Sequence, residues 1–179
     1  MEYCGIVFSG LPGAGKSALV NVLAAKYCWP AFSAGGQWRK RYEELYPDQK
    51  ITFEEYWRLI PLDDKRKFND GVDEVYAKGK VVGDSRYPIN LRTCPLLLVF
   101  ITADIETRAS LALKLGKYGH ADLETIKSIL SARESDETKT GFEILNYDYR
   151  DPNYYHLVIN SAKLTIDEEA MIVESVVKP

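Results

Sequence analysis

The chain has few cysteines, few histidines and no long hydrophobic segment. Its apolar runs fall well short of the ~20 residues that a membrane-spanning helix needs. The N-terminus has neither the basic start nor the apolar stretch of a signal peptide. Cys4, Cys28 and Cys94 form no CxxC pair and have no zinc-site spacing. We therefore expect a cytoplasmic protein that makes no membrane contact and keeps its cysteines reduced.

Positive charge is not in excess either. The sequence has 23 Lys and Arg against 26 Asp and Glu, which gives a formal net charge of −3. This balance argues against a nucleic-acid-binding face, so an anionic ligand must be held locally. With 179 residues, 46% of them hydrophobic, and no internal repeat, the sequence predicts a single domain over residues 1–179. We expect it to be a monomer.

Short apolar runs separated by helical segments set the expected fold. The runs that predict strands are residues 4–9, 29–33, 80–84, 96–102 and 156–160. They are continuous, which is typical of parallel strands covered by helices on both faces. Capping boxes at Thr52 and Thr165 mark the starts of two helices. The pattern predicts a three-layer α/β fold with five parallel strands in the order 2-3-1-4-5.

Two segments are expected to be additions to this core. About 45 residues separate the second and third strands, which is too many for one crossover helix. Residues 34–78 should therefore form a small helical insertion that grips a second substrate. Residues from about 116 to 150 should form a lid region, because their central part, 131–139, is strongly charged and weakly apolar.

A phosphate-binding loop is the strongest motif. Residues 10–17 match the pattern G-x-x-x-x-G-K-[ST] in full and lie between an apolar strand and a helix. Backbone N–H groups would turn inward around a β-phosphate, with the positive end of the following helix facing the same anion. Lys16 would bridge the β- and γ-phosphates of ATP, and Ser17 would bind Mg²⁺. The expected nucleotide-binding residues are Gly10, Gly13, Ala14, Gly15, Lys16, Ser17 and Ala18.

Polar residues follow the third predicted strand. Asp84 should lie at the carboxyl edge of the sheet beside the phosphate loop, where it could hold the Mg²⁺ shell through water. A solvated carboxylate or a helix cap is the alternative for Asp84. Arg86 should point into the same crevice with a guanidinium fork suited to a phosphate. Its alternative is a surface arginine paired with a carboxylate.

Several further motifs share one order and spacing. They are Ser33-Ala34-Gly35 followed by Arg39, then Gly83-Asp84-Ser85-Arg86, then Arg133-Glu134-Ser135-Asp136, Asn146-Tyr147-Asp148 and residues 155–160. Together with the phosphate loop, they make nearly the whole chain resemble the archaeal-type cytidylate kinases, which are nucleoside monophosphate kinases of the P-loop fold. The resemblance implies that ATP donates a phosphoryl group, with Mg²⁺, to a nucleoside monophosphate, and that CMP or dCMP is the expected acceptor.

The resemblance also implies roles for individual residues. Ser33, Arg39 and Arg86 would bind the acceptor monophosphate, and Asp84 would lie near the reacting phosphates. Arg133 would reach these phosphates from the lid. Arg108 would start the lid helix beside the phosphates of ATP. Arginines suit these places because phosphoryl transfer between two polyanions spreads negative charge over the moving oxygens.

The sequence departs from that family in the lid helix. Leu111 and Leu115 stand where the family carries further arginines, and only Lys114 and Lys117 are close by. A P-loop kinase of another small metabolite and a non-catalytic nucleotide-binding module therefore remain alternatives. A regulatory GTPase does not fit, since residues 101–104 read Ile-Thr-Ala-Asp where Asn-Lys-x-Asp is required.

Overall fold

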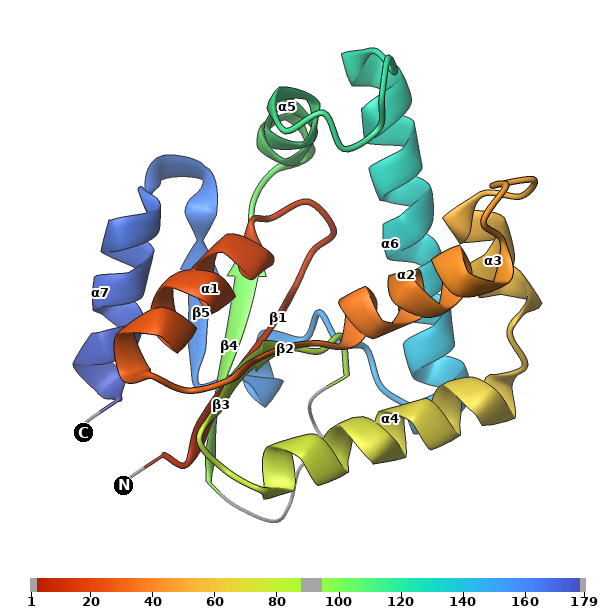
Figure 1. Ribbon diagram of the computed structural model, residues 1–179. Coiled ribbons are helices and arrows are strands. Elements are labelled where there is room, and N and C mark those ends of the chain that lie inside the picture. Colours follow the sequence, from red (N-terminus) through yellow and green to blue (C-terminus); the bar gives the residue numbers. More distant parts are fainter. Residues whose placement is uncertain (1–2, 88–94, 178–179) are drawn as a thin grey trace.

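A parallel sheet forms the centre of the computed structural model, which describes residues 3–87 and 95–177. Its strands are β1 (Gly5–Gly10), β2 (Ala31–Ser33), β3 (Val81–Asp84), β4 (Leu96–Thr102) and β5 (Leu157–Asn160). All neighbouring strands are parallel and follow the order β2-β3-β1-β4-β5 (Figure 1). The predicted fold and strand order are confirmed, and only the ends of some strands differ from the predicted runs.

The described helices lie between consecutive strands or after the last strand. They are α1 (Lys16–Tyr27), α2 (Ala34–Leu45), α3 (Phe53–Leu59), α4 (Leu62–Ala77), α5 (Ile105–Lys114), α6 (Leu123–Leu145) and α7 (Ile166–Val176), with short 3-10 turns η2 (Pro152–Tyr154) and η3 (Ser161–Lys163). The capping boxes that the sequence predicts are present at the starts of α3 and α7. In each box a threonine hydroxyl accepts a hydrogen bond from the backbone of a glutamate whose side chain bonds back.

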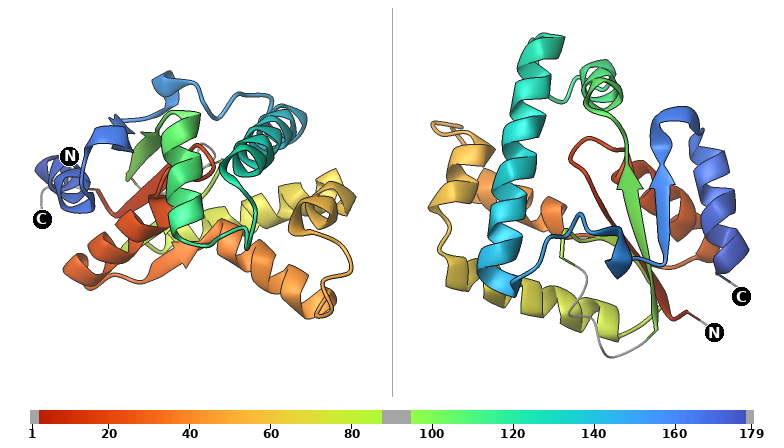
Figure 2. Two further views of the ribbon diagram at one scale, coloured as in Figure 1. Left: turned by 90° about the horizontal axis from the view of Figure 1, so that it is seen from above. Right: turned by 180° about the vertical axis from the view of Figure 1, so that it is seen from behind.

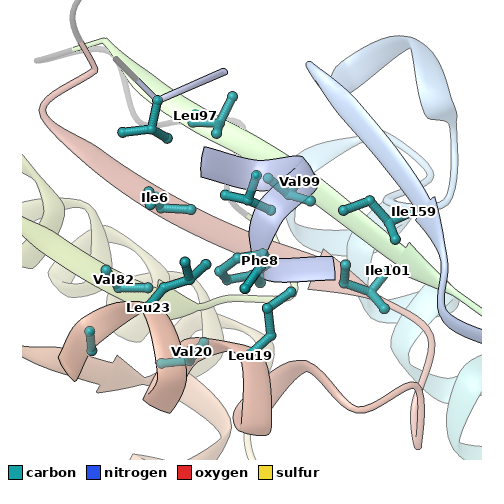
Figure 3. Close-up of a cluster of buried hydrophobic side chains, with 14 of the residues drawn as sticks. Ile6, Phe8, Leu19, Val20, Leu23, Val82, Leu97, Val99, Ile101 and Ile159 are labelled. Atoms are coloured by element: carbon teal, nitrogen blue, oxygen red, sulfur yellow. The ribbon is translucent and has the colours of Figure 1, made fainter. Parts of the chain in front are cut away.

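Both faces of the sheet are covered, as Figures 1 and 2 show. On one face Ile6 and Phe8 of β1 pack in a core with residues of α1 and α7, part of which is drawn in Figure 3. On the other face Val7 packs with Val72 and Tyr76 of α4. Because successive strand residues point to opposite faces, burial on both sides explains why the apolar runs are continuous in sequence.

Segments 34–78 and 116–150 contribute helices beside the sheet, and α4 of the first contacts α6 of the second. Helices α2, α3 and α4 lie between β2 and β3 in the chain, and aromatic residues such as Trp38 and Tyr56 pack α2 against α3. Residues 131–139 lie within α6, an unbroken helix of 23 residues. Ile126 and Leu130 of α6 pack against Ala109 and Ala112 of α5. The charged segment is thus part of a packed helix.

The expectation for the cysteines is only partly met. Cys28 is an exposed free thiol, whereas Cys4 is disulfide-bonded, so the prediction that all the cysteines are reduced is wrong at Cys4. Cys94 lies outside the described residues. Within residues 3–87 and 95–177, no helix is long and apolar enough to cross a membrane.

Candidate active site

The phosphate loop joins β1 to α1 at the carboxyl edge of the sheet. Gly10 has a φ of 135°, and a Cβ on this residue would lie 2.0 Å from the carbonyl oxygen of Ile101, so only glycine fits. Lys16 Nζ donates to the carbonyl oxygens of Gly10 (3.0 Å) and Leu11 (2.7 Å). Burial, followed by the charge of Arg86, lowers the pKa of Lys16 well below its usual range. A nearby anion would offset this burial penalty.

The start of α1 is arranged for an anion. Gly15 precedes the helix with a φ of 89°, and it offers no side chain to cap the first backbone N–H groups. The first turn of α1 also has no acidic residue, whereas α3 and α7 begin with threonine caps and acidic first turns. Backbone N–H groups at the start of α1 therefore point their partial positive charge toward the loop. A helix start arranged in this way is suited to binding a phosphate.

A buried carboxylate from α6 holds two of the predicted arginines. Glu137 Oε1 accepts from the guanidinium groups of Arg86 (3.0 Å) and Arg133 (2.9 Å). Its Oε2 lies 2.8 Å from Nε of Arg86. Arg86 also donates to the carbonyl oxygen of Gly10 and lies over the ring of Tyr149. Burial raises the pKa of Glu137, but the charges of Arg86 and Arg133 outweigh burial and bring the net pKa below its usual value.

Arg108 bonds to the backbone of the phosphate loop. It comes from α5 and is 5% exposed. Its guanidinium donates to the carbonyl oxygens of Ala103 (3.0 Å) and Pro12 (3.1 Å) and pairs with Glu134 (3.1 Å). Arg108 does not line the cleft between the phosphate loop and segment 34–78. Its observed contacts therefore fix the loop against α5 and α6.

A single cleft of about 890 Å³ connects the phosphate loop with the helical segment 34–78. Most of the predicted site residues line it: Gly13, Gly15, Lys16, Ser17, Ala18, Ser33, Arg39, Asp84, Arg86 and Arg133. Gly10, Ala14 and Arg108 lie outside this lining. The cleft also contains Leu111, Leu115 and Lys117, so apolar side chains occupy part of the wall where the family resemblance implies arginines.

Ser33 and Arg39 line the cleft from the start of α2 and its second turn. The hydroxyl of Ser33 accepts from the backbone N–H of Gly36 (3.0 Å) and caps α2. Arg39, six residues after Ser33 in α2, is exposed and lies 5.3 Å from the ring centroid of Phe53. Desolvation by the cleft, followed by the charge of Arg133, lowers the pKa of Arg39. No ion pair of the described residues engages Arg39, so its guanidinium is available to an anionic ligand.

Asp84 and Ser17 are the candidate oxygen ligands for a cation. Asp84 ends β3 opposite Phe8 and Ser33 on the neighbouring strands. Its Oδ1 is buried without a hydrogen-bond partner in the described part of the chain. Ser17 is exposed in the first turn of α1. One carboxylate and one hydroxyl fit Mg²⁺, which binds few protein ligands and keeps several waters.

Sequence reasoning missed Glu137 and the residues lining the distal part of the cleft. Glu137 lies four residues after Arg133, a spacing that places both on one helical face, so a signal existed once a helix was expected there. Lys65 and Asn69 of α4 also line the cleft and are almost fully buried. They belong to no recognised motif. Only the three-dimensional arrangement brings them to the site.

Comparison with known proteins supports the resemblance seen in the sequence. No family model matches the chain. It is 26% identical to a cytidylate kinase of Methanocaldococcus jannaschii over 96% of both chains. It is also 26% identical to a cytidylate kinase of Methanoregula boonei, covering 96% of this chain and 93% of the relative. The predicted resemblance to archaeal cytidylate kinases is confirmed.

Solved structures show the same fold. A protein from Eubacterium ventriosum described as uncharacterized has a TM-score of 0.72 and 16% identity, covering 97% of each chain. A shikimate kinase from Bacteroides thetaiotaomicron has a TM-score of 0.59 and 14% identity, covering 96% of this chain and 97% of the kinase. A gluconokinase from Sinorhizobium meliloti has a TM-score of 0.59 and 18% identity, covering 96% of this chain and 90% of the gluconokinase. At these identities the likeness shows the P-loop kinase fold alone.

Proposed function

We propose that this protein is a nucleoside monophosphate kinase that transfers the γ-phosphoryl group of ATP to CMP or dCMP. The products are ADP and the nucleoside diphosphate. The observation that carries this proposal is the single cleft in which the phosphate loop faces a second cationic centre, Arg39, across the carboxyl edge of the sheet. Similarity to cytidylate kinases over nearly the full chain supports the same activity.

In this proposal the loop and the start of α1 bind the phosphates of ATP. Lys16 exchanges the carbonyl oxygens of Gly10 and Leu11 for the β- and γ-phosphates. Ser17 and Asp84 would hold Mg²⁺, which would neutralise developing negative charge when bound. Arg108 acts through Pro12 by keeping the loop in position, so we treat it as a positioning residue.

The acceptor phosphate binds on the opposite side of the cleft. Ser33 and Arg39 of the 34–78 insertion contact it, and Arg86 and Arg133 contribute positive charge close to the reacting oxygens. The acceptor phosphate is an ionised nucleophile at neutral pH, so alignment and charge stabilisation suffice without a strong general base. Neither histidine is required: His156 accepts a backbone hydrogen bond from Leu98 (3.0 Å), and His120 lies in an exposed turn.

Closure completes the proposed cycle. Segment 116–150 is expected to move over the bound substrates and exclude water, because water in the cleft would turn the kinase into an ATPase. We further propose that the protein works as a monomer in the cytoplasm and that no nucleic acid or membrane takes part. The net charge of −3 agrees with small anionic substrates held locally in the cleft.

A coupled ADP-release assay tests the proposal. The acceptors are CMP, dCMP, UMP, AMP and GMP, with shikimate and gluconate added to cover kinases of small hydroxylated metabolites. Turnover with CMP or dCMP at the highest kcat/KM is the expected result. Turnover with a hydroxylated metabolite alone would favour the other kinase class. Nucleotide binding without turnover on any acceptor would favour the non-catalytic module.

A further inference from the structure

The distal end of the cleft has aromatic walls. Trp38 of α2 lies 4.5 Å from Phe68 of α4 and 5.6 Å from Trp57 of α3, measured between ring centroids. All three residues line the cleft. Flat aromatic walls favour a planar ligand that stacks on them or meets their edges. Arg39 lines the same cleft, so these rings are candidates to hold the base of a nucleotide whose phosphate binds Arg39.

Unusual polar groups lie among these rings. Asn69 is 4% exposed, and its Nδ2 has no hydrogen-bond partner among the described residues. Trp57 Nε1 is also buried and has no hydrogen-bond partner among the described residues. Lys65, one turn before Asn69 on α4, is 7% exposed and lies 4.5 Å from the ring centroid of Trp57. Leaving buried donors unpaired lowers stability, so these groups need an explanation beyond packing.

The three groups share one property, which is that each donates hydrogen bonds. Acceptor atoms on a ligand could therefore bind to Asn69 Nδ2, Trp57 Nε1 and the Lys65 ammonium. An acceptor of hydrogen bonds lies in the same cleft, on α6. Asp136 Oδ2 accepts a hydrogen bond from Arg58 (2.9 Å), and its other oxygen, Oδ1, accepts none from the described residues. The cleft thus offers several donors together with the carboxylate of Asp136.

We infer that Asn69, with Lys65 and Asp136, reads the hydrogen-bonding edge of the acceptor's base and selects cytosine. This inference rests on the proposed function. Cytosine presents two adjacent acceptors, O2 and N3, followed by the N4 amino donor. The first two match the donors on α4 and the third matches the carboxylate on α6. Uracil carries an N–H at position 3, which would face a donor. Adenine lacks the O2 carbonyl, and guanine presents two donors where acceptors are needed.

Removal of the Asn69 amide tests the inference through acceptor selectivity. Asn69→Ala should lower kcat/KM for CMP by roughly 10- to 100-fold through KM, and it should bring the CMP to UMP ratio close to one. KM for ATP should not change. Asn69→Asp, which replaces the donor with an acceptor, should shift the ratio toward UMP. Asn153→Ala is the matched control, since Asn153 is exposed and bonded locally to Asp151 (2.8 Å).

Thermal unfolding separates base recognition from a structural role. A buried donor without a partner stabilises nothing, so Asn69→Ala should keep the Tm of the unaltered protein. A fall in Tm together with an equal loss of activity toward every acceptor would overturn the inference. An unchanged CMP to UMP ratio in well-folded Asn69→Ala would also overturn it, while the kinase activity would stand.

Binding without turnover distinguishes this inference from the proposed function. Trp38 and Trp57 line the pocket, and Trp29→Phe would remove the remaining tryptophan signal. Fluorescence titration with CMP and UMP then reports occupancy directly. Preference for CMP that disappears in Asn69→Ala supports the inference even if the unaltered protein transfers no phosphate. Absence of CMP binding to the unaltered protein would overturn both proposals.

Discussion

Arg86 and Glu137 form a bidentate ion pair across the cleft, with Nε 2.8 Å from Oε2 and a terminal guanidinium nitrogen 3.0 Å from Oε1. Arg86 therefore does not meet the substrates as an unpaired cation. Pairing with a carboxylate is the alternative role that the sequence predicts for Arg86, and Glu137 of α6 is that carboxylate. An incoming phosphate must share the positive charge of Arg86 and Arg133 with Glu137, so this carboxylate sets how strongly the two arginines attract anions.

Replacement of that carboxylate should destabilise the protein. Glu137→Gln leaves two nearly buried guanidinium groups without their counter-charge, and we expect a loss on the order of 2–4 kcal/mol in the free energy of unfolding. Urea denaturation measures the change. Added inorganic phosphate should restore stability more in Glu137→Gln than in the unaltered protein, because the anion replaces the missing charge. Exposed Glu143→Gln is the control, and equal stability of both variants would contradict the account.

Arg39 and Arg86 should respond differently to truncation. Arg39→Ala should raise the acceptor KM and lower kcat/KM by a loss on the order of 2–4 kcal/mol. Its Tm should stay unchanged, because Arg39 is exposed and unpaired in the described ion pairs. Arg86→Ala should reduce both acceptor use and Tm, because it removes the partner of Glu137. Weakened ATP binding with unaltered acceptor binding in Arg39→Ala would reverse the assignment of the two half-sites.

Substitution by alanine should change stability in opposite directions at Gly10 and Gly71. Gly10→Ala should cost more than about 2 kcal/mol of stability, because the new Cβ would meet the backbone of β4 at a positive φ. Gly71 lies within α4, where an added Cβ meets nothing within 4 Å. Gly71→Ala should therefore stabilise the protein by about 0.5–1 kcal/mol. Equal Tm values for the two variants would show that the loop tolerates a side chain at residue 10.

Glu169 of α7 should make stability depend on pH. Burial raises the pKa of this carboxyl to about 7, so the native state holds its proton over a pH range in which the unfolded state has released it. Stability should fall as pH rises from the unfolded pKa to about 7 and stay lower above it. Glu169→Gln should gain on the order of 1–3 kcal/mol at pH 8 and little at pH 4. A pH-independent difference in urea denaturation would contradict this explanation.

The sequence predicted the sheet better than it predicted the site's distal half. Gly10, Lys16 and the apolar run after Cys4 belong to continuous sequence patterns, a phosphate-loop motif and a buried strand, which can be recognised without knowing what they contact. Asn69 and Glu137 depend instead on how α4 and α6 approach the sheet. That approach is set by packing between segments distant in the chain, which local patterns do not encode. The disulfide at Cys4 was missed because cysteine spacing alone does not reveal which residues meet in space.

The central claim is that the phosphoryl group passes from ATP to the phosphate of CMP under the charge of Lys16. Product analysis of a reaction with γ-labelled ATP, CMP and Mg²⁺ tests it most directly. We expect labelled CDP and an equal amount of unlabelled ADP from the unaltered protein, and we expect no CDP from a Lys16→Ala variant that keeps its Tm. Labelled inorganic phosphate without CDP, or undiminished CDP from Lys16→Ala, would contradict the account.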